Sequence, residues 1–357
     1  PVESGHFTEN MDAYDLYLQA ADPTAVLSTE NMRRRVLLLE QSVAEDPKFA
    51  KAWAELASAL IALPGWDHSI NLLEYTNRAR QAAEQALLLN PAESKAHLAL
   101  ASVFATEYNW QAWYEQQQPI REFSADDPGA AVDGFVQSGE RWLGLGYLAR
   151  ALEVAEAGLE LQPDIANLHV IKAIVLLNLG KRKEALVHQE QAVLLGFAGS
   201  LSDQLWEYVE PINREAAWAA TMTMYLKVYE PDLLRLMPHL KRVHFAPVDS
   251  LEEERKRFWL VARELGISKE YLLSKSPRWG YRIAPATISQ LGEHELLAEQ
   301  FWGNSPFYWM WSPNLWLFRQ SDSFKSRVRS SGMLDFWKEI GWPDLCRPFG
   351  NDDFVCD

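Results

Sequence analysis

The chain has 357 residues, of which 48% are hydrophobic and 23% charged, a composition typical of a folded protein rather than a disordered one. It contains 49 acidic and 34 basic residues, and the resulting net charge of −15 argues against a nucleic-acid-binding surface in this chain. No stretch approaches the roughly 18 consecutive apolar residues that a membrane-spanning helix needs. Because the chain begins at Pro1, without Met or a signal region, we interpret it as a piece of a longer protein.

The first helices are indicated by capping residues. Residues 1–27 are expected to form an N-terminal cap with one helix from about Asp12. Ser28 then precedes a helical pattern that runs to Val43, because a serine side chain at this position accepts hydrogen bonds from the first turn. Asp46-Pro47 marks the end of that helix, since proline does not continue one.

Residues 28–199 contain an internal repeat with a period near 34 residues. Each period reads as a helix, a glycine-containing turn and a second helix with small residues on one face. Such small residues let two helices cross closely, because side-chain bulk sets the distance between their axes. The residues that recur at an interval of 34 are Gly146 and Gly180, Ala151 and Ala185, and Gly158 and Ala192.

These units resemble the tetratricopeptide repeat. The residues that carry the resemblance upstream are Trp53, Leu56, Ala57, Leu60, Ala79, Ala83, Ala86 and Pro91. The resemblance covers about residues 28–197 and implies an all-α, tetratricopeptide-like helical solenoid. We expect two departures from the regular pattern: an insertion around Pro64–Ser69, and a short or broken second helix at Pro119.

Residues 200–357 form a helical, Trp-rich C-terminal region without a clean period. Ten of the 15 tryptophans lie there, and its charge is more balanced, with 22 acidic and 19 basic residues against 27 and 15 in residues 1–200. We therefore expect a boundary near residue 199, followed by degenerate repeats that cap the solenoid. The helices predicted are Leu251–Leu265, Thr287–Trp302, and two short helices within Phe324–Ile340 that are broken at Gly332.

The end of the chain is similar to the C-terminal half of bacterial multi-domain signalling proteins, on the segments Gly332-Met333-Leu334, Phe336-Trp337 and Trp342-Pro343-Asp344. In that family a winged-helix or cyclase domain and a TolB-like segment precede the repeats. The resemblance implies a non-catalytic sensory or scaffold module of a larger bacterial regulator, with a protein or peptide partner. Nothing in the sequence predicts the partner's identity or an oligomeric state.

The sequence contains no complete motif for catalysis or for binding a metal or cofactor. We therefore expect that the protein is not an enzyme and holds no metal or cofactor. His294-Glu295 opens like a zinc-protease motif, but Glu299 falls near where its second histidine would be needed. His97 and His169 occupy matching places in two repeats and are expected to pack between helices. Asp352-Asp353 lacks the pattern of a calcium-binding loop.

Two surfaces are candidates for binding. In repeats of this family the first helix of each pair lines the inner face, and the side chains expected there are Lys51, Ser58, Lys95, Ser102, Glu140, Asn167 and Ile174. A plain solvated surface is the alternative. The clamp that binds terminal carboxylates in some repeats is not evident, since Glu55 stands where Asn would follow Lys51.

The second candidate is the aromatic segment 301–318, where Trp302, Tyr308, Trp309 and Trp311 could form an interface. An exposed patch of this kind would suit a glycan-binding or glycan-processing protein, which is the alternative function. The rings could instead wedge the C-terminal helices together, and we favour that interpretation.

The two cysteines, Cys346 and Cys356, lie ten residues apart. The Pro, Gly and Asn between them favour a turn that could bring the thiols together. Free thiols in a cytosolic protein and a disulfide in an oxidising compartment both fit the sequence. We favour the disulfide, and with it an extracytoplasmic, periplasmic location over a cytoplasmic one.

Overall fold

The structure is a computed structural model, and it describes residues 8–21, 28–67, 69–123, 127–196, 231–273, 275–276, 280–281, 285–301, 310–311, 313–350 and 353–357. The chain divides into two compact units, unit 1 with residues 1–138 and 331–341, and unit 2 with residues 139–330 and 342–357. The predicted boundary near residue 199 stays a prediction, because residues 197–230 lie outside the described residues.

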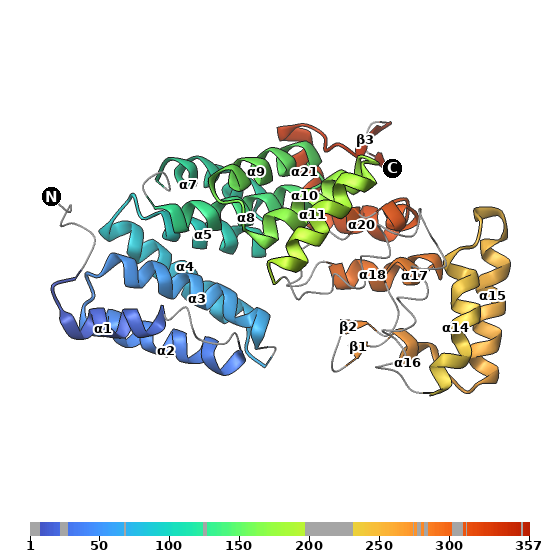
Figure 1. The fold of residues 1–357 in the computed structure, drawn as a ribbon, viewed down its shortest axis with the longest axis horizontal. Helices are drawn as coiled ribbons and strands as arrows, with labels where there is room; N and C mark the ends of the chain where they lie inside the picture. The colour runs from blue at the N-terminus through green and yellow to red at the C-terminus, as the bar shows by residue number, and fades with distance from the viewer. Residues whose placement is uncertain are drawn as a thin grey trace. The chain divides into compact units, whose positions relative to one another are not determined.

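Unit 1 consists of successive helix pairs (Figure 1). Its helices are α1 (Met11–Ala20), α2 (Thr29–Glu45), α3 (Ala50–Trp66), α4 (Leu72–Leu89), α5 (Ser94–Thr106), α6 (Trp110–Glu115), α7 (Gln117–Phe123), the first part of α8 (Pro128–Gly144), and α21 (Met333–Ile340). Ser28 caps α2 by accepting a hydrogen bond from the Asn31 amide, as predicted. Alanines at the contacts between helices are almost completely buried, among them Ala57, Ala79 and Ala83. The small alanine side chains therefore let the axes of neighbouring helices approach each other closely.

The two predicted departures from the repeat are present. The segment around Pro64–Ser69 lengthens the third helix, so that α3 has 17 residues and carries Pro64 inside it. The second helix of the next pair is broken into α6 and α7, and Pro119 lies in the first turn of α7. Proline is tolerated there because amides of the first turn have no partner within the helix.

A recurring hydrogen bond joins three of the first helices, α3, α5 and α10, to the proline that precedes each of them. The side-chain nitrogens Trp53 Nε1, His97 Nε2 and His169 Nε2 lie 3.0, 3.0 and 2.9 Å from the carbonyl oxygens of Pro47, Pro91 and Pro163. In each case the side chain follows the proline by six residues. His97 also contacts Gln116 at the end of α6, and His169 contacts His188 of α11, so the prediction that both histidines pack between helices is confirmed.

Unit 2 completes the repeats and adds short elements. Its elements are the end of α8, α9 (Leu148–Leu161), α10 (Ala166–Asn178), α11 (Arg182–Leu194), α14 (Pro231–His244), α15 (Val248–Glu264), α16 (Lys269–Leu273), β1 (Lys275–Ser276), β2 (Gly280–Tyr281), α17 (Pro285–Gln290), α18 (His294–Phe301), the 3₁₀ turn η2 (Pro313–Leu315), α19 (Trp316–Arg319), α20 (Asp322–Ser330), β3 (Cys346–Phe349) and β4 (Asp353–Cys356). Two antiparallel hairpins, β1–β2 and β3–β4, are the strands among the described residues. The described residues thus form an all-α fold of tetratricopeptide-like helix pairs, followed by a helical C-terminal region.

Two of the three helix predictions for residues 200–357 are confirmed. Leu251–Leu265 corresponds to α15, and Phe324–Ile340 corresponds to α20 and α21 on either side of Gly332. The single helix predicted at Thr287–Trp302 is wrong, because α17 and α18 divide it. Gly292 lies between them with φ +84°, a left-handed conformation that ends a helix and that glycine adopts easily.

Residues 331–341 belong to unit 1 although they are distant from it in sequence. The indole nitrogen of Trp110 donates to the carbonyl oxygen of Ser331 at 2.7 Å. Phe336 meets Trp113 and Tyr114 edge to face, with ring centroids 6.4 and 6.1 Å apart. Helix α21 thereby covers the broken second helix α6. No helix among the described residues is both long and apolar enough to cross a membrane.

Candidate partner-binding face of the first helices

A buried carboxylate on the first helix α3 is the centre of a charged network in unit 1. Glu55 lies on α3, is only 4% exposed, and stands in an otherwise alanine- and leucine-rich helix. Its carboxylate accepts a hydrogen bond from Arg35 Nη2 of α2 at 2.6 Å, and a second, short one from Lys95 Nζ of α5. Three helices thus bring their charges together at one point.

The electrostatics show that the cations dominate around Glu55. Burial acts to raise the pKa of its carboxyl, but the charges and hydrogen bonds of Lys95 and Arg35 outweigh burial and hold the pKa below its ordinary value. Burial likewise acts to lower the pKa of Lys95, yet Glu55 raises it. Both groups therefore stay ionised as a compensated pair. Burial, followed by the charge of Glu55, raises the pKa of the neighbouring Tyr17 to about 12.

Asp133 on α8 lies beside this network, and no ion pair within 4 Å joins it to a described residue. Its side chain reaches solvent, but the surrounding helices displace enough water to raise its pKa. Lys95 opposes this effect, whereas Glu55 and Asp127 add to it by repulsion. Asp133 is therefore an exposed acid whose ionised form a further cation would stabilise.

The predicted residues of unit 1 lie on the expected helices. Lys51 and Ser58 are half-buried on α3. Lys95 contacts Glu55, and the Ser102 hydroxyl of α5 donates to Gln137 Oε1 of α8 at 3.0 Å. The network thus includes Lys95 and adds partners that the sequence analysis did not select.

In unit 2 the predicted residues form a separate pair. Asn167 Nδ2 of α10 donates to Glu140 Oε1 of α8 at 3.5 Å. Burial raises the pKa of Glu140, while Arg141 and the bond from Asn167 lower it. Ile174 was expected on the accessible face, and that prediction is wrong: Ile174 is only 3% exposed and packs in the core of α10.

Sequence reasoning missed Arg35, Tyr17 and Asp133, and passed over Glu55. A signal for Glu55 was present, because it is the only acid between Ala50 and Leu63. An acid within an apolar helix calls for a buried partner. No comparable signal separates Arg35 from Arg33 and Arg34, its neighbours in sequence.

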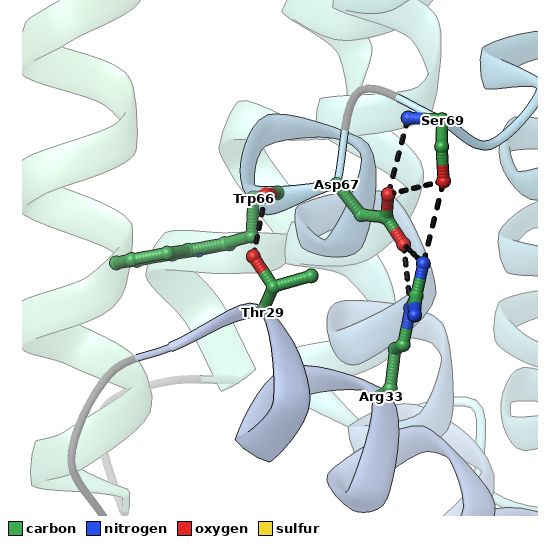
Figure 2. A network of polar contacts seen from close by, with 5 residues as sticks. All are labelled: Thr29, Arg33, Trp66, Asp67 and Ser69. Carbon is green, nitrogen blue, oxygen red and sulfur yellow. Dashed lines mark hydrogen bonds and ion pairs between the residues drawn. The ribbon is translucent and has the colours of Figure 1, made fainter. Parts of the chain in front are cut away.

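A second polar network has a structural role, and Figure 2 shows how it closes the α3–α4 connection. Arg33 Nε donates to Asp67 Oδ2 at 2.6 Å, and the backbone amide and hydroxyl of Ser69 donate to Asp67 Oδ1 at 3.1 and 2.6 Å. Thr29 donates to the carbonyl oxygen of Trp66 at 2.8 Å. The bonds from Ser69, followed by Arg33, lower the pKa of Asp67 against the effect of burial. The lengthened connection is therefore held on the start of α2.

The aromatic segment 301–318 is described only in part, and two of its described rings are buried. Trp311 is completely buried, and its indole N–H donates to the carbonyl oxygen of Gly144 at 2.8 Å. Trp311 is therefore not an exposed interface residue, which corrects that part of the prediction. Phe318 is also completely buried. Trp302, Tyr308 and Trp309 lie outside the described residues.

The terminal cysteines form the disulfide that we favoured. Cys346 and Cys356 are bonded and stand opposite each other in the β3–β4 hairpin, with Cα atoms 4.1 Å apart. Phe354 is buried against Phe324, whereas Phe349 is 62% exposed. Lys325 and Arg329 of α20 each contact Asp353 at 2.7 Å. The hairpin is thus fixed to α20 by one ring and two ion pairs.

Potential metal ligands do not cluster in the part of the chain that the structure describes. No three histidine, cysteine or acidic side chains there are placed to hold a metal ion. His294 Nε2 lies 3.0 Å from the carbonyl oxygen of Ser289, and burial lowers the pKa of this histidine. That contact gives His294 a structural role in the α17–α18 turn.

Comparisons with known proteins bear little on the function. No protein-family profile and no curated protein matches the chain. Among solved structures, the product of Pseudomonas aeruginosa pilF is 16% identical, with 62% of this chain and 94% of that one covered and a TM-score of 0.48. MamA is 16% identical, with 46% and 89% covered and a TM-score of 0.35. YrrB, described as a TPR protein with an unusual peptide-binding site, is 16% identical, with 54% and 91% covered and a TM-score of 0.33. At these scores the likeness carries no argument, and the fold assignment rests on the helix pairs themselves.

Proposed function

We propose that the chain is a non-catalytic module that binds a segment of a protein partner through the first helices of unit 1. The observation that carries the proposal is the Arg35–Glu55–Lys95 network, which holds polar groups of three helices in one arrangement beside the accessible Asp133. A surface that is ordered before binding loses little side-chain entropy when a partner binds.

The charges favour a basic segment of the partner. Lys95 is already compensated by Glu55, so it is poorly suited to bind an acidic group of a partner. Asp133 has no ion-pair partner among the described residues, and a lysine or arginine of the partner would stabilise its ionised form. The net charge of −15 also attracts a basic segment at long range.

A peptide series tests this proposal. Three pools of short fluorescent peptides stand in for the partner. The pools have the same composition and differ only at one fixed position, which is Lys, Gln or Glu. The affinity of each pool for the protein is measured by fluorescence anisotropy. We expect the Lys series to bind at least about tenfold more tightly than the Glu series, and Asp133→Asn to remove most of that preference. Glu84→Gln is the matched control, because Glu84 is an exposed acid on the second helix α4. Equal affinities for the three series, or the same loss in the control, contradict the proposal.

Two broader proposals concern context. We propose that the module serves as a sensory or scaffold part of a larger bacterial regulator, supported by the resemblance of the segment from Gly332 to Asp344 to such proteins. The complete reading frame tests this idea, since it must encode a winged-helix or cyclase domain.

We also propose an extracytoplasmic location, supported by the Cys346–Cys356 disulfide. Cell fractionation tests it. A glycan-binding function is not proposed, because Trp311 is buried and the other three predicted rings lie outside the described residues.

A further inference from the structure

Two histidines of unit 2 face each other across the α10–α11 pair. His169 of α10 and His188 of α11 place their Nδ1 atoms 2.9 Å apart. The ring centroids are 5.2 Å apart and the ring planes differ by 28°. Because the short distance joins the near edges of the rings, the two imidazoles meet edge to edge, as the donor and acceptor of one hydrogen bond.

The positions of the hydrogens on this pair follow from its other contacts. His169 Nε2 lies 2.9 Å from the carbonyl oxygen of Pro163, which can only accept, so His169 Nε2 carries a hydrogen. When both rings are neutral, His169 Nδ1 is therefore the acceptor and His188 Nδ1–H the donor. One added proton can bind His188 Nε2, so that a single hydrogen still lies between the two Nδ1 atoms. A second added proton places N–H against N–H at 2.9 Å and adds a second positive charge, so the bond is lost.

The surroundings disfavour the doubly charged state. His169 is only 8% exposed. Burial, followed by the charges of Lys172 and His169, lowers the pKa of His188, while Glu156 and Glu184 act in the opposite direction. Lys172 of α10 is itself paired with Glu156 of α9 at 2.8 Å, so these two charges largely compensate each other. The ionisable groups facing the pair thus come from all three adjoining helices, α9, α10 and α11.

The chain contains an internal comparison. His97 occupies the place of His169 in an earlier repeat, and its Nε2 lies 3.0 Å from the carbonyl oxygen of Pro91. Nineteen residues further on stands Gln116 instead of a histidine, 2.9 Å from His97 Nδ1, just as His188 follows His169 by nineteen. A glutamine amide can turn its oxygen or its nitrogen to the ring, so it satisfies both the neutral and the charged histidine.

We propose that the His169–His188 pair is a proton-sensitive latch between α10 and α11, which holds while the pair carries at most one positive charge and opens when both rings are protonated. A histidine that stays neutral in the fold stabilises it above the ordinary histidine pKa of 6.5, and that contribution is lost as the pH falls through its lowered folded value. Acidification therefore loosens α11 from α10 while the His97–Gln116 contact in unit 1 persists.

Hydrogen exchange measured by mass spectrometry on the whole chain tests the latch. Protection is compared at pH about 7.5 and about 5 after correction for the intrinsic exchange rate, in the wild type and in His188→Gln, which copies the Gln116 arrangement. We expect the protection of α11 amides in the wild type to fall about tenfold or more at the lower pH, and that of α5 to stay unchanged. In His188→Gln the loss at α11 should be absent. An equal loss in the two proteins, or no loss in the wild type, overturns the proposal.

A second measurement covers the outcome in which His188→Gln does not fold. Nuclear magnetic resonance of the imidazole nitrogens in the wild type follows the two rings directly. We expect two macroscopic titration steps, with the second displaced to lower pH, because a coupled pair loses its protons one after the other. Two independent titrations near the ordinary histidine pKa contradict the shared proton and sink the proposal.

Discussion

The ring of Trp311 lies against the backbone of Gly146, so that a Cβ atom at residue 146 would stand 2.7 Å from Trp311 Cζ2. Gly146 has φ +88° and occupies the turn between α8 and α9. The glycine that marks the repeat in the sequence therefore has a second task in the fold, which is to make room for a tryptophan 165 positions further on. Gly180, its equivalent one repeat later, has φ +73° and no atom within 4 Å of the same position.

This difference predicts two unequal alanine substitutions. Gly146→Ala should lower the free energy of unfolding by about 3–5 kcal/mol, because a left-handed alanine is strained and the added methyl collides with Trp311. Gly180→Ala carries only the backbone strain and should lower it by about 1–2 kcal/mol. Urea unfolding followed by circular dichroism measures both. Equal effects would show that the contact with Trp311 contributes nothing.

Glu55→Gln should destabilise the fold by about 2–4 kcal/mol, because it leaves Arg35 and Lys95 close together without the carboxylate that compensates them. The exposed control Glu84→Gln should change stability by less than about 0.5 kcal/mol. Thermal and urea unfolding of the two variants decide the point. A charge reversal such as Lys95→Glu would place an acid against Glu55, so it tests folding rather than partner binding.

The same carboxylate predicts an acid-dependent loss of stability. The folded pKa of Glu55 lies below its ordinary value of 4.5, so its contribution is complete above about pH 4.5 and is lost as the pH falls through the lowered value. The urea midpoint of the wild type should therefore fall more steeply in acid than that of Glu55→Gln. Parallel curves for the two proteins would contradict this assignment.

The terminal hairpin should depend on its disulfide. Thiol titration of the denatured protein without reductant should find no reactive thiol, since Cys346 and Cys356 are bonded. Replacing both by serine should lower the free energy of unfolding by about 2–3 kcal/mol in the chain-entropy account of a short loop. Two reactive thiols in the unreduced protein would remove both the bond and the support for an extracytoplasmic location.

The two phenylalanines of that hairpin provide a matched pair. Phe354→Ala should cost about 3–5 kcal/mol of stability, because Phe354 is completely buried against Phe324. Phe349→Ala should change stability by less than about 0.5 kcal/mol, because Phe349 is mostly exposed. Similar losses for both would mean that the hairpin is not fixed to α20 in the way the contacts indicate.

Local features of the fold were predictable from the sequence by itself. The cap at Ser28, the break in the helix around Pro119 and the turn between Cys346 and Cys356 each depend on residues close together in the chain. The repeat was visible for the same reason, since small residues must recur wherever a helix pair recurs. The error at Thr287–Trp302 was local as well: the apolar period continues across Gly292, although the backbone there is left-handed.

Only the tertiary structure decided which distant side chains meet. Lys95 is 40 residues from Glu55, Trp311 is 167 residues from Gly144, and Trp110 is 221 residues from Ser331. Periodicity shows which face of a helix a residue occupies, but not which other helix covers that face. Lys95 therefore looked like an available cation and is compensated, and Trp311 looked like a possible interface and is buried. Charge compensation and burial are properties of neighbours in space, and packing alone assigns those neighbours.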